Sequence, residues 1–140
     1  MENVRKLVKD ANRLFNTADH LAYVTYSTVK DTKLMVTIAE NLYLSLLNAM
    51  EAILYYERLY KRISPLSDNF NSRLEVFKTK CIPRYNIDRD FVALINDLRQ
   101  ILEQRRKSSI EFSRGDKFII ATEDYRIKTL TIDKLKAYIH

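Results

Sequence analysis

Apolar residues repeat with the period of an α-helix from the start of the chain. This stripe predicts one long amphipathic helix over residues 2–28. Asp31 or Thr32 is placed to cap a second helix, which is predicted to run to about Arg62. Pro65 then prevents the helix from continuing, because proline lacks the backbone N–H and clashes with the preceding turn. The first half of the chain is therefore predicted to be two long helices.

The middle of the second helix, residues 42–50, is apolar on almost every side, which is typical of a helix at the centre of a bundle. A polar seam with spacings of four, four and three crosses it, made of Thr37, Asn41, Ser45 and Asn48. Two interpretations stay open. The seam is either a small buried polar site, or a set of amides and hydroxyls that bond neighbouring helices.

Two shorter helical segments follow. Ser67 is placed to cap a helix that ends at Pro83, and its inward face is Phe70, Leu74, Phe77 and Cys81. Asp88 is placed to cap a fourth helix that ends in Arg105, Arg106 and Lys107. Cations at this position suit the negative end of the helix dipole.

The pattern changes after residue 108, where β-branched and aromatic residues dominate three short runs. These runs are Ile110–Phe112, Lys117–Thr122 and Arg126–Leu130, with turn residues 113–116 and 123–124 between them. They predict a small antiparallel hairpin or meander. Thr131 is then placed to cap a closing helix over residues 132–139, with Leu130 and Leu135 at the two hydrophobic-staple positions.

The predicted fold class is α+β, mostly α, in a single domain over residues 1–140. An antiparallel bundle of four main helices occupies residues 1–107, and a β-hairpin or meander with a short terminal helix occupies 108–140. The chain has one glycine, two prolines and one cysteine. This composition argues against loop-rich folds, glycine-rich phosphate loops, internal disulfides and multi-thiolate metal sites.

The usual catalytic motifs are missing from the sequence: there is no GxGxxG, Walker loop, HExxH, EF-hand loop or GxSxG. The chain holds only two histidines, and one of them is the C-terminal His140. We therefore predict no catalytic residues, no cofactor and no metal. Cys81 lies on an apolar helix face and is interpreted as a buried hydrophobe. No apolar run reaches the length of a membrane span, and we expect a soluble, cytoplasmic protein without a membrane partner.

The net charge of +6 is unevenly distributed. Residues 1–57 carry six Lys and Arg against seven Asp and Glu, whereas residues 58–140 carry eighteen against eleven. All of the positive excess therefore lies beyond residue 57. Such asymmetry indicates a basic surface for nucleic acid or another polyanion. The alternative is a solvated, lysine-rich surface of the kind that solubility alone favours.

Basic residues interleaved with tyrosines give the candidate nucleic-acid-binding residues. They form three clusters along the sequence: Arg58, Lys61 and Arg62 at the end of the second helix, Arg84 and Tyr85 beside Pro83, and Arg105, Arg106 and Lys107 at the end of the fourth helix. Lysine and arginine neutralise phosphates, and tyrosine rings stack on unpaired bases. The clusters form one binding surface only if the fold brings them to one face. Otherwise the tyrosines serve as packing residues.

The helical part of the chain also resembles HEPN domains in helix order, with Ala39-Glu40-Asn41-Leu42 leading into Leu46-Leu47-Asn48-Ala49-Met50. HEPN ribonucleases carry an arginine followed four to six residues later by a histidine. Arg105 and Arg106 stand near the place of that arginine, but residues 109–114 contain no histidine. The resemblance therefore implies an inactive member that binds RNA or a partner protein.

Three hypotheses about function follow. The first is a non-enzymatic intracellular module that binds RNA or another polyanion. The second is a scaffold that forms homodimers or binds another protein, with no nucleic-acid role. The third is a HEPN-like ribonuclease with atypical catalytic residues.

Overall fold

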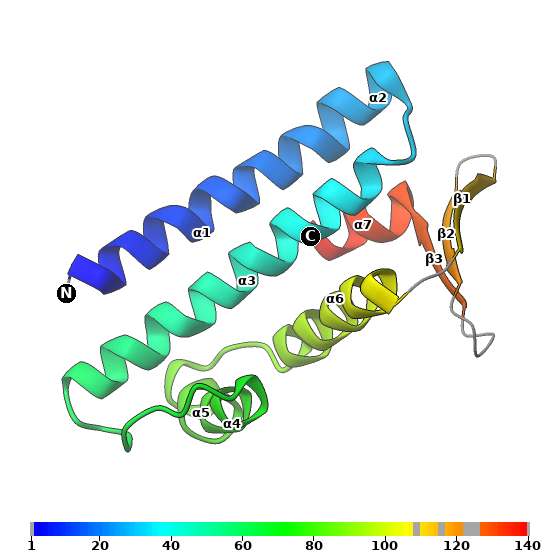
Figure 1. The fold of residues 1–140 in the computed structure, drawn as a ribbon. Coiled ribbons are helices and arrows are strands. Elements are labelled where there is room, and N and C mark those ends of the chain that lie inside the picture. Colours follow the sequence, from blue (N-terminus) through cyan, green and yellow to red (C-terminus); the bar gives the residue numbers. More distant parts are fainter. Residues whose placement is uncertain (1, 108–109, 115–116, 122–126, 140) are drawn as a thin grey trace.

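The computed structural model describes residues 2–107, 110–114, 117–121 and 127–139. Its first half is a long antiparallel helix pair (Figure 1). The first arm consists of α1 (Glu2–His20), the π-helical η1 (Leu21–Thr25) and α2 (Tyr26–Val29), which continue one another. The second arm is α3 (Leu34–Leu59). Both predicted long helices are present.

The two arms are joined by a tight turn. Lys30 ends the first arm in the left-handed region, with φ of 54°. The Asp31 carboxylate then accepts a hydrogen bond from the Lys33 backbone N–H at 3.0 Å. This bond satisfies a backbone donor at the helix start that has no partner within the helix. Asp31 thus closes the turn that precedes α3, but the residue at the N-cap position of α3 is Lys33, which makes no side-chain capping bond.

The third predicted helix is divided into α4 (Phe70–Val76), the π-helical η2 (Phe77–Cys81) and α5 (Ile82–Tyr85). Its capping residue is Asn69, whose side chain accepts a hydrogen bond from Ser72 N–H at 3.2 Å, so the prediction of Ser67 is wrong. Pro83 does not end the helix. It stands at the beginning of α5, where proline is tolerated because the first turn's N–H groups have no helical acceptor.

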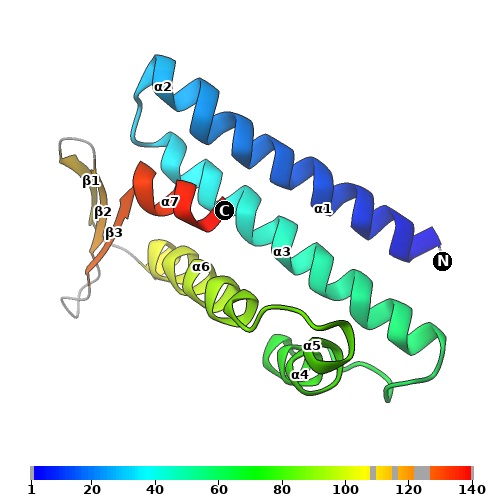
Figure 2. The ribbon, with the colours of Figure 1, turned by 180° about the vertical axis from the view of Figure 1, so that it is seen from behind.

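The remaining elements are α6 (Asp90–Lys107), the strands β1 (Ile110–Arg114), β2 (Lys117–Ala121) and β3 (Ile127–Thr131), and α7 (Ile132–Ile139). The strands pair antiparallel in the order β1-β2-β3, a meander. The sheet stands at the end of the molecule beyond α6 and α7 (Figure 2). Residues 115–116 and 122–126 of the two predicted turns lie outside the described residues.

The closing helix begins as predicted. The Thr131 hydroxyl accepts a hydrogen bond from Lys134 N–H at 3.2 Å, which is the geometry of an N-cap. Leu130 and Leu135 on either side of it are fully buried. The far end of α7 is fastened to α6, because the Tyr138 hydroxyl donates to the Asp97 carboxylate.

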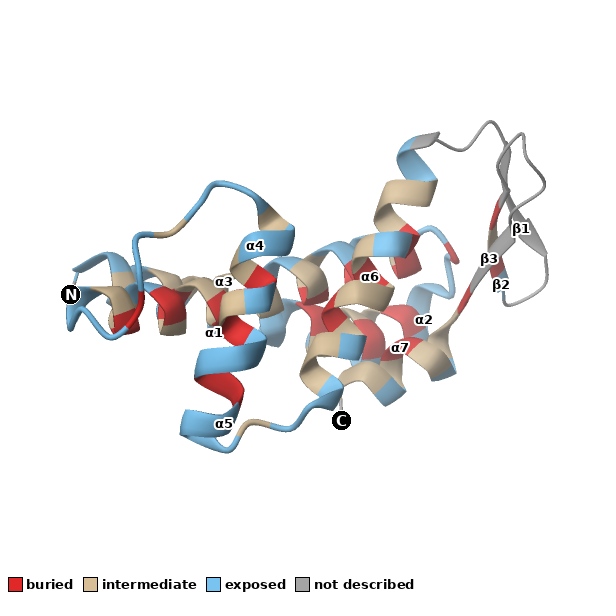
Figure 3. Cartoon of the chain, turned by 90° about the horizontal axis from the view of Figure 1, so that it is seen from below, coloured by how far each residue is buried: buried red, intermediate tan, exposed pale blue. Residues whose placement is uncertain are grey.

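Two hydrophobic clusters meet along α3 (Figure 3). The first joins the α1–α2 arm, the first half of α3, α6, the sheet and α7. The second joins the second half of α3 to α4, η2, α5 and the start of α6. Both clusters draw on α3 and α6. Most of the described residues are helical and three strands form one small sheet, so the α+β, mostly α fold class is confirmed. Within the described residues, no helix is both long and apolar enough to cross a membrane.

Candidate functional site

The predicted nucleic-acid-binding residues divide into two regions of the structure. Arg58 lies in the last turn of α3, and Lys61 and Arg62 lie just beyond it, where α5 brings Arg84 and Tyr85. Arg105 and Arg106 lie at the far end of α6, and the side chain of Lys107 lies outside the description. The fold thus brings the first two clusters together and leaves the third apart.

A buried carboxylate joins the first two clusters. Glu57 is 2% exposed, and its Oε1 lies 3.2 Å from Arg62 Nη1 and 3.6 Å from Arg84 Nε. The Tyr85 hydroxyl also donates a hydrogen bond to it. A buried charge is tolerated only when it is paired and hydrogen-bonded, and Glu57 meets that condition through residues from two separate segments.

The ionisation of this cluster follows from its contacts. Burial alone would raise the pKa of Glu57, but the hydrogen bonds from Tyr85 and Arg62 and the positive charge of Arg84 lower it overall. The hydrogen bond to Glu57, together with burial, raises the pKa of Tyr85. Glu57 is therefore a carboxylate at neutral pH, and it neutralises part of the positive charge that the sequence places here.

A basic pocket adjoins this cluster. The segment after α3 folds back against α4 and η2 (Figure 1) and encloses about 460 Å³, which we call the loop pocket. Its lining contains four cations, Lys61, Arg62, Arg73 and Lys80, and four hydroxyl side chains, Ser64, Ser67, Ser72 and Thr79. Among the described residues, no Asp or Glu lines it, although the carboxylates of Glu51, Glu57 and Asp68 lie within 4 Å of its two arginines.

The four cations of the loop pocket differ in how far they are neutralised. Arg62 is held by Glu57, and Arg73 Nη1 lies 3.0 Å from Glu51 Oε1. Lys61 and Lys80 form no ion pair within the part of the chain that the structure describes. The pocket therefore keeps two unpaired lysines beside two fixed guanidinium groups.

Lys61 is held in an unusual backbone conformation. It ends α3 with φ of 56°, in the left-handed region that glycine adopts most readily. Its N–H donates to the Arg58 carbonyl at 2.9 Å, and Arg62 N–H donates to the Glu57 carbonyl at 3.0 Å. These bonds close the helix end and place Lys61 at the pocket. A lysine here costs stability that a glycine would not.

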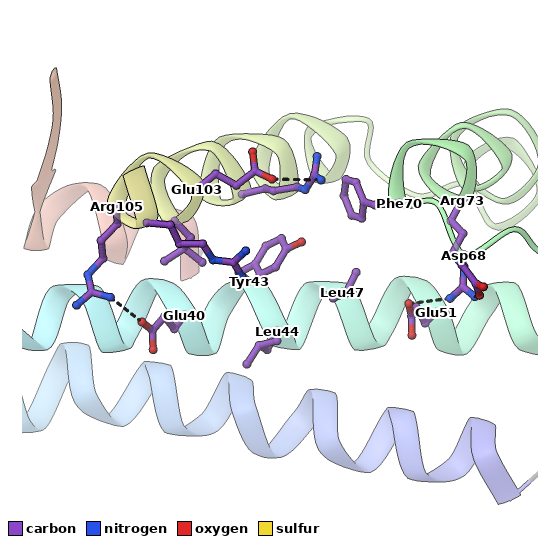
Figure 4. A pocket seen from close by; sticks show the side chains of 13 residues that line it. Glu40, Tyr43, Leu44, Leu47, Glu51, Asp68, Phe70, Arg73, Glu103 and Arg105 are labelled. Carbon is purple, nitrogen blue, oxygen red and sulfur yellow. Dashed lines mark hydrogen bonds and ion pairs between the residues drawn. The ribbon is translucent and has the colours of Figure 1, made fainter. Parts of the chain in front are cut away.

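A second concave region, the α3–α6 groove, contains the third predicted cluster (Figure 4). It encloses about 510 Å³ between α3, α6 and the start of α4. Four arginines line it, Arg73, Arg99, Arg105 and Arg106, together with four acids, Glu40, Glu51, Asp68 and Glu103. Positive and negative charges are balanced in this groove.

Most charges of the α3–α6 groove are paired within it. Arg105 Nη1 lies 3.7 Å from Glu40 Oε1, and Arg99 Nη2 lies 3.2 Å from Glu103 Oε1. Burial raises the pKa of Tyr43, which lies among these charges, and the nearby Arg99 opposes that shift. The groove therefore offers a polyanion much less net charge than the loop pocket does.

The buried residue of the polar seam on α3, Ser45, joins two helices and lines no binding site that the structure describes. The Ser45 hydroxyl is buried and donates to the Ala11 carbonyl of α1 at 2.7 Å. The Asn41 amide donates to the carbonyl of Thr37, one turn earlier on the same helix, at 2.8 Å. These bonds stay within and between the two helix arms, so they favour the packing interpretation over a binding site.

The single cysteine lies in the second hydrophobic cluster. Cys81 is fully buried. Burial first, and then the nearby negative charge of Glu57, raises the pKa of its thiol to about 11. Such a thiol is a poor nucleophile at neutral pH. Among the described residues, no group of three or more His, Cys, Asp or Glu is arranged to hold a metal ion.

Sequence reasoning missed part of the lining of the loop pocket and the buried carboxylate beside it. No sequence motif identifies Arg73 and the hydroxyl residues as part of a binding site, because they come close to Lys61 only when the segment after α3 folds back. Glu57 did carry a signal, since it continues the buried face of Met50 and Leu54 at helical spacing. A carboxylate on an apolar stripe indicates a buried ion pair.

Comparison of the chain with family models, curated proteins and solved structures finds no match.

Proposed function

We propose that this protein is a non-enzymatic module that binds single-stranded RNA, or a polyanion of similar chemistry, at the loop pocket. The observation that carries the proposal is the lining of that pocket. Its described residues include four cations, of which Lys61 and Lys80 have no ion pair among the described residues, and four hydroxyl side chains, with no Asp or Glu among them. Phosphate groups bind through charge-assisted hydrogen bonds from such cations, and hydroxyls add further donors.

The surroundings of the pocket support the same function. Residues 58–89 carry eight Lys and Arg against three Asp and Glu, a net charge of +5. Exposed tyrosine rings stand among these cations: Tyr60 is 53% exposed and Tyr85 is 42% exposed. Arg62 also lies over the Tyr60 ring, 5.1 Å from its centroid. Exposed aromatic rings beside cations are the surface on which unpaired bases stack.

Titration of a labelled single-stranded RNA at two salt concentrations tests the proposal. The double variant Lys61→Gln/Lys80→Gln is expected to weaken binding by about tenfold at low salt and to reduce the salt slope by about 1.4, because each single-strand phosphate contact contributes about 0.7. The matched control is Lys30→Gln/Lys33→Gln, which removes two charges at the turn between α2 and α3, whereas the loop pocket follows the other end of α3. Equal losses in both variants would contradict the proposal.

The same titration addresses the catalytic alternative. RNA recovered after long incubation with wild-type protein and Mg²⁺ is expected to keep its length on a denaturing gel. Shortened RNA would overturn the non-enzymatic part of the proposal and favour an atypical HEPN-like ribonuclease. The double variant Arg105→Gln/Arg106→Gln is expected to bind RNA more tightly than the loop-pocket variant does, because the α3–α6 groove balances its charges internally.

A protein-interaction role is favoured by one observation. Val4, Tyr55 and Leu59 line a shallow pocket of about 360 Å³ where α1 begins and α3 ends, and Leu59 is 50% exposed. Light scattering tests this second candidate. A dimeric mass that becomes monomeric in Leu59→Lys, without any binding of RNA, would favour a homo-oligomeric scaffold.

A further inference from the structure

A second pocket, which has no Asp or Glu among the described residues that line it, lies on the other side of η2. It encloses about 630 Å³ between η2, α5 and the start of α6, and we call it the α5–α6 pocket. It is lined by Lys78, Thr79, Ile82, Pro83, Asn86, Ile87, Arg89, Val92 and Ala93. Most of these described lining residues are apolar, and the two charged ones, Lys78 and Arg89, are both cations.

Only η2 separates this pocket from the loop pocket. Thr79 lines both pockets, while its neighbours are divided between them, with Lys78 in one and Lys80 in the other. All three side chains are exposed. The two pockets are therefore adjacent, and their cations form a basic path across η2.

The cations of this path are available to a ligand. Lys78 and Arg89, like Lys61 and Lys80, have no salt-bridge partner among the described residues. The nearby acid Asp88 is engaged locally, because its carboxylate accepts a hydrogen bond from Asp90 N–H at 2.9 Å. Four unpaired cations thus lie on one path, two in each pocket.

We propose that the ligand is a single strand several nucleotides long, which runs from the loop pocket across η2 into the α5–α6 pocket. This inference rests on the proposed function and specifies its ligand. Lys78 and Arg89 would contact phosphates, and the apolar side chains of Pro83, Ile87 and Val92 would contact base faces. A free phosphate or a single nucleotide would fill only one pocket. A strand uses both, because its backbone repeats a negative charge at every nucleotide.

Binding of two oligouridylates, of about 4 and about 12 nucleotides, tests this proposal, since single-strand sites commonly span such lengths. Wild-type protein is expected to bind the longer strand at least tenfold more tightly than the shorter one. The variant Lys78→Gln/Arg89→Gln is expected to narrow that difference and to reduce the salt slope for the longer strand by about 1.4. Lys30→Gln/Lys33→Gln is the matched control.

The outcomes separate this proposal from the proposed function. Equal affinity for the two oligouridylates would refute the strand path and leave the loop-pocket proposal standing. The same conclusion would follow if Lys78→Gln/Arg89→Gln bound RNA like the control while Lys61→Gln/Lys80→Gln lost affinity. If neither oligouridylate binds at low salt, both proposals fail. Circular dichroism of each variant shows whether the helices are retained, and only variants with the wild-type spectrum are compared.

Discussion

Neutralising the buried carboxylate of Glu57 should destabilise the protein measurably, although all three of its partners, Arg62, Arg84 and Tyr85, reach solvent. Its side chain is 3% exposed, whereas those of Arg62 and Arg84 are 36% and 49% exposed. The variant Glu57→Gln keeps the shape of the side chain and removes only its charge. Any loss of stability therefore reports the charge network and not a cavity.

The magnitude follows from the contacts. A hydrogen bond to a charged group is roughly twice as strong as a neutral one, so the Tyr85 bond loses about 1 kcal/mol. Each half-exposed ion pair contributes about 0.5 kcal/mol. Burying an amide in place of a carboxylate recovers part of this loss. We expect Glu57→Gln to lower the free energy of unfolding by about 1–2 kcal/mol at pH 7.

Urea unfolding followed by circular dichroism measures this difference. With a slope of about 2 kcal/mol per molar urea for a chain of this size, the midpoint should fall by about 0.5–1 M. The control is Glu40→Gln, whose partner Arg105 is 3.7 Å away and about half exposed, so its cost should stay below about 0.5 kcal/mol. Equal midpoints for the two variants would refute the reasoning.

Acid should abolish the difference between wild type and Glu57→Gln. The pKa of Glu57 is lower in the folded protein than in the unfolded chain. Its contribution to the unfolding free energy is therefore complete above the pKa of the unfolded chain, and it is lost as the pH falls through the pKa of the folded protein. The unfolding free energies of the two proteins should therefore converge as the pH is lowered below about 4. A difference that stays constant on acidification would contradict an ionic role for Glu57.

Three further predictions test other parts of the fold. Lys61→Gly should raise the unfolding free energy by about 1 kcal/mol and weaken RNA binding, because glycine relieves the strain of the left-handed backbone but removes a cation. Lys30 has the same left-handed conformation, so Lys30→Gly should stabilise the protein to a similar extent and leave RNA binding unchanged. Stabilisation in only one of the two variants would contradict the strain argument. The Cys81 thiol should resist a thiol reagent at pH 8 until denaturant is added, and rapid labelling of the native protein would show that the site opens. Leu135→Ala should cost about 2–5 kcal/mol in urea unfolding, because Leu135 is fully buried where α7 packs, and a loss below about 1 kcal/mol would mean that α7 is not part of the cooperative core.

Local patterns predicted most of the secondary structure because their signals act over one or two helical turns. The apolar period predicted both arms of the helix pair, and Thr131 was recognised as the cap of α7 from the residues around it. Local signals failed where two of them competed. Ser67 and Asn69 are both good capping residues, and only the path of the loop decides that Asn69 accepts the bond from Ser72.

Two of the eight predicted binding residues, Lys61 and Arg62, line the loop pocket, but the sequence does not indicate how that pocket is arranged. The sequence indicates that cations accumulate beyond residue 57, and it suggests Lys61 and Arg62 as binding residues. It does not indicate that Lys80 joins them while Arg105 pairs with Glu40 in a separate groove. Those contacts join residues on different helices, and their geometry depends on the packing of α3 against η2 and α6.

The chain's own pattern thus determines a mostly helical protein with a basic second half, because helix period, caps and charge are properties of neighbouring residues. Tertiary structure alone decides which charges are neutralised and which remain available. Glu57 is buried against Arg62, Arg84 and Tyr85 only because the second hydrophobic cluster holds α3 and α5 together. The free energy that fixes this arrangement comes from many dispersed apolar contacts, and no short stretch of sequence contains them.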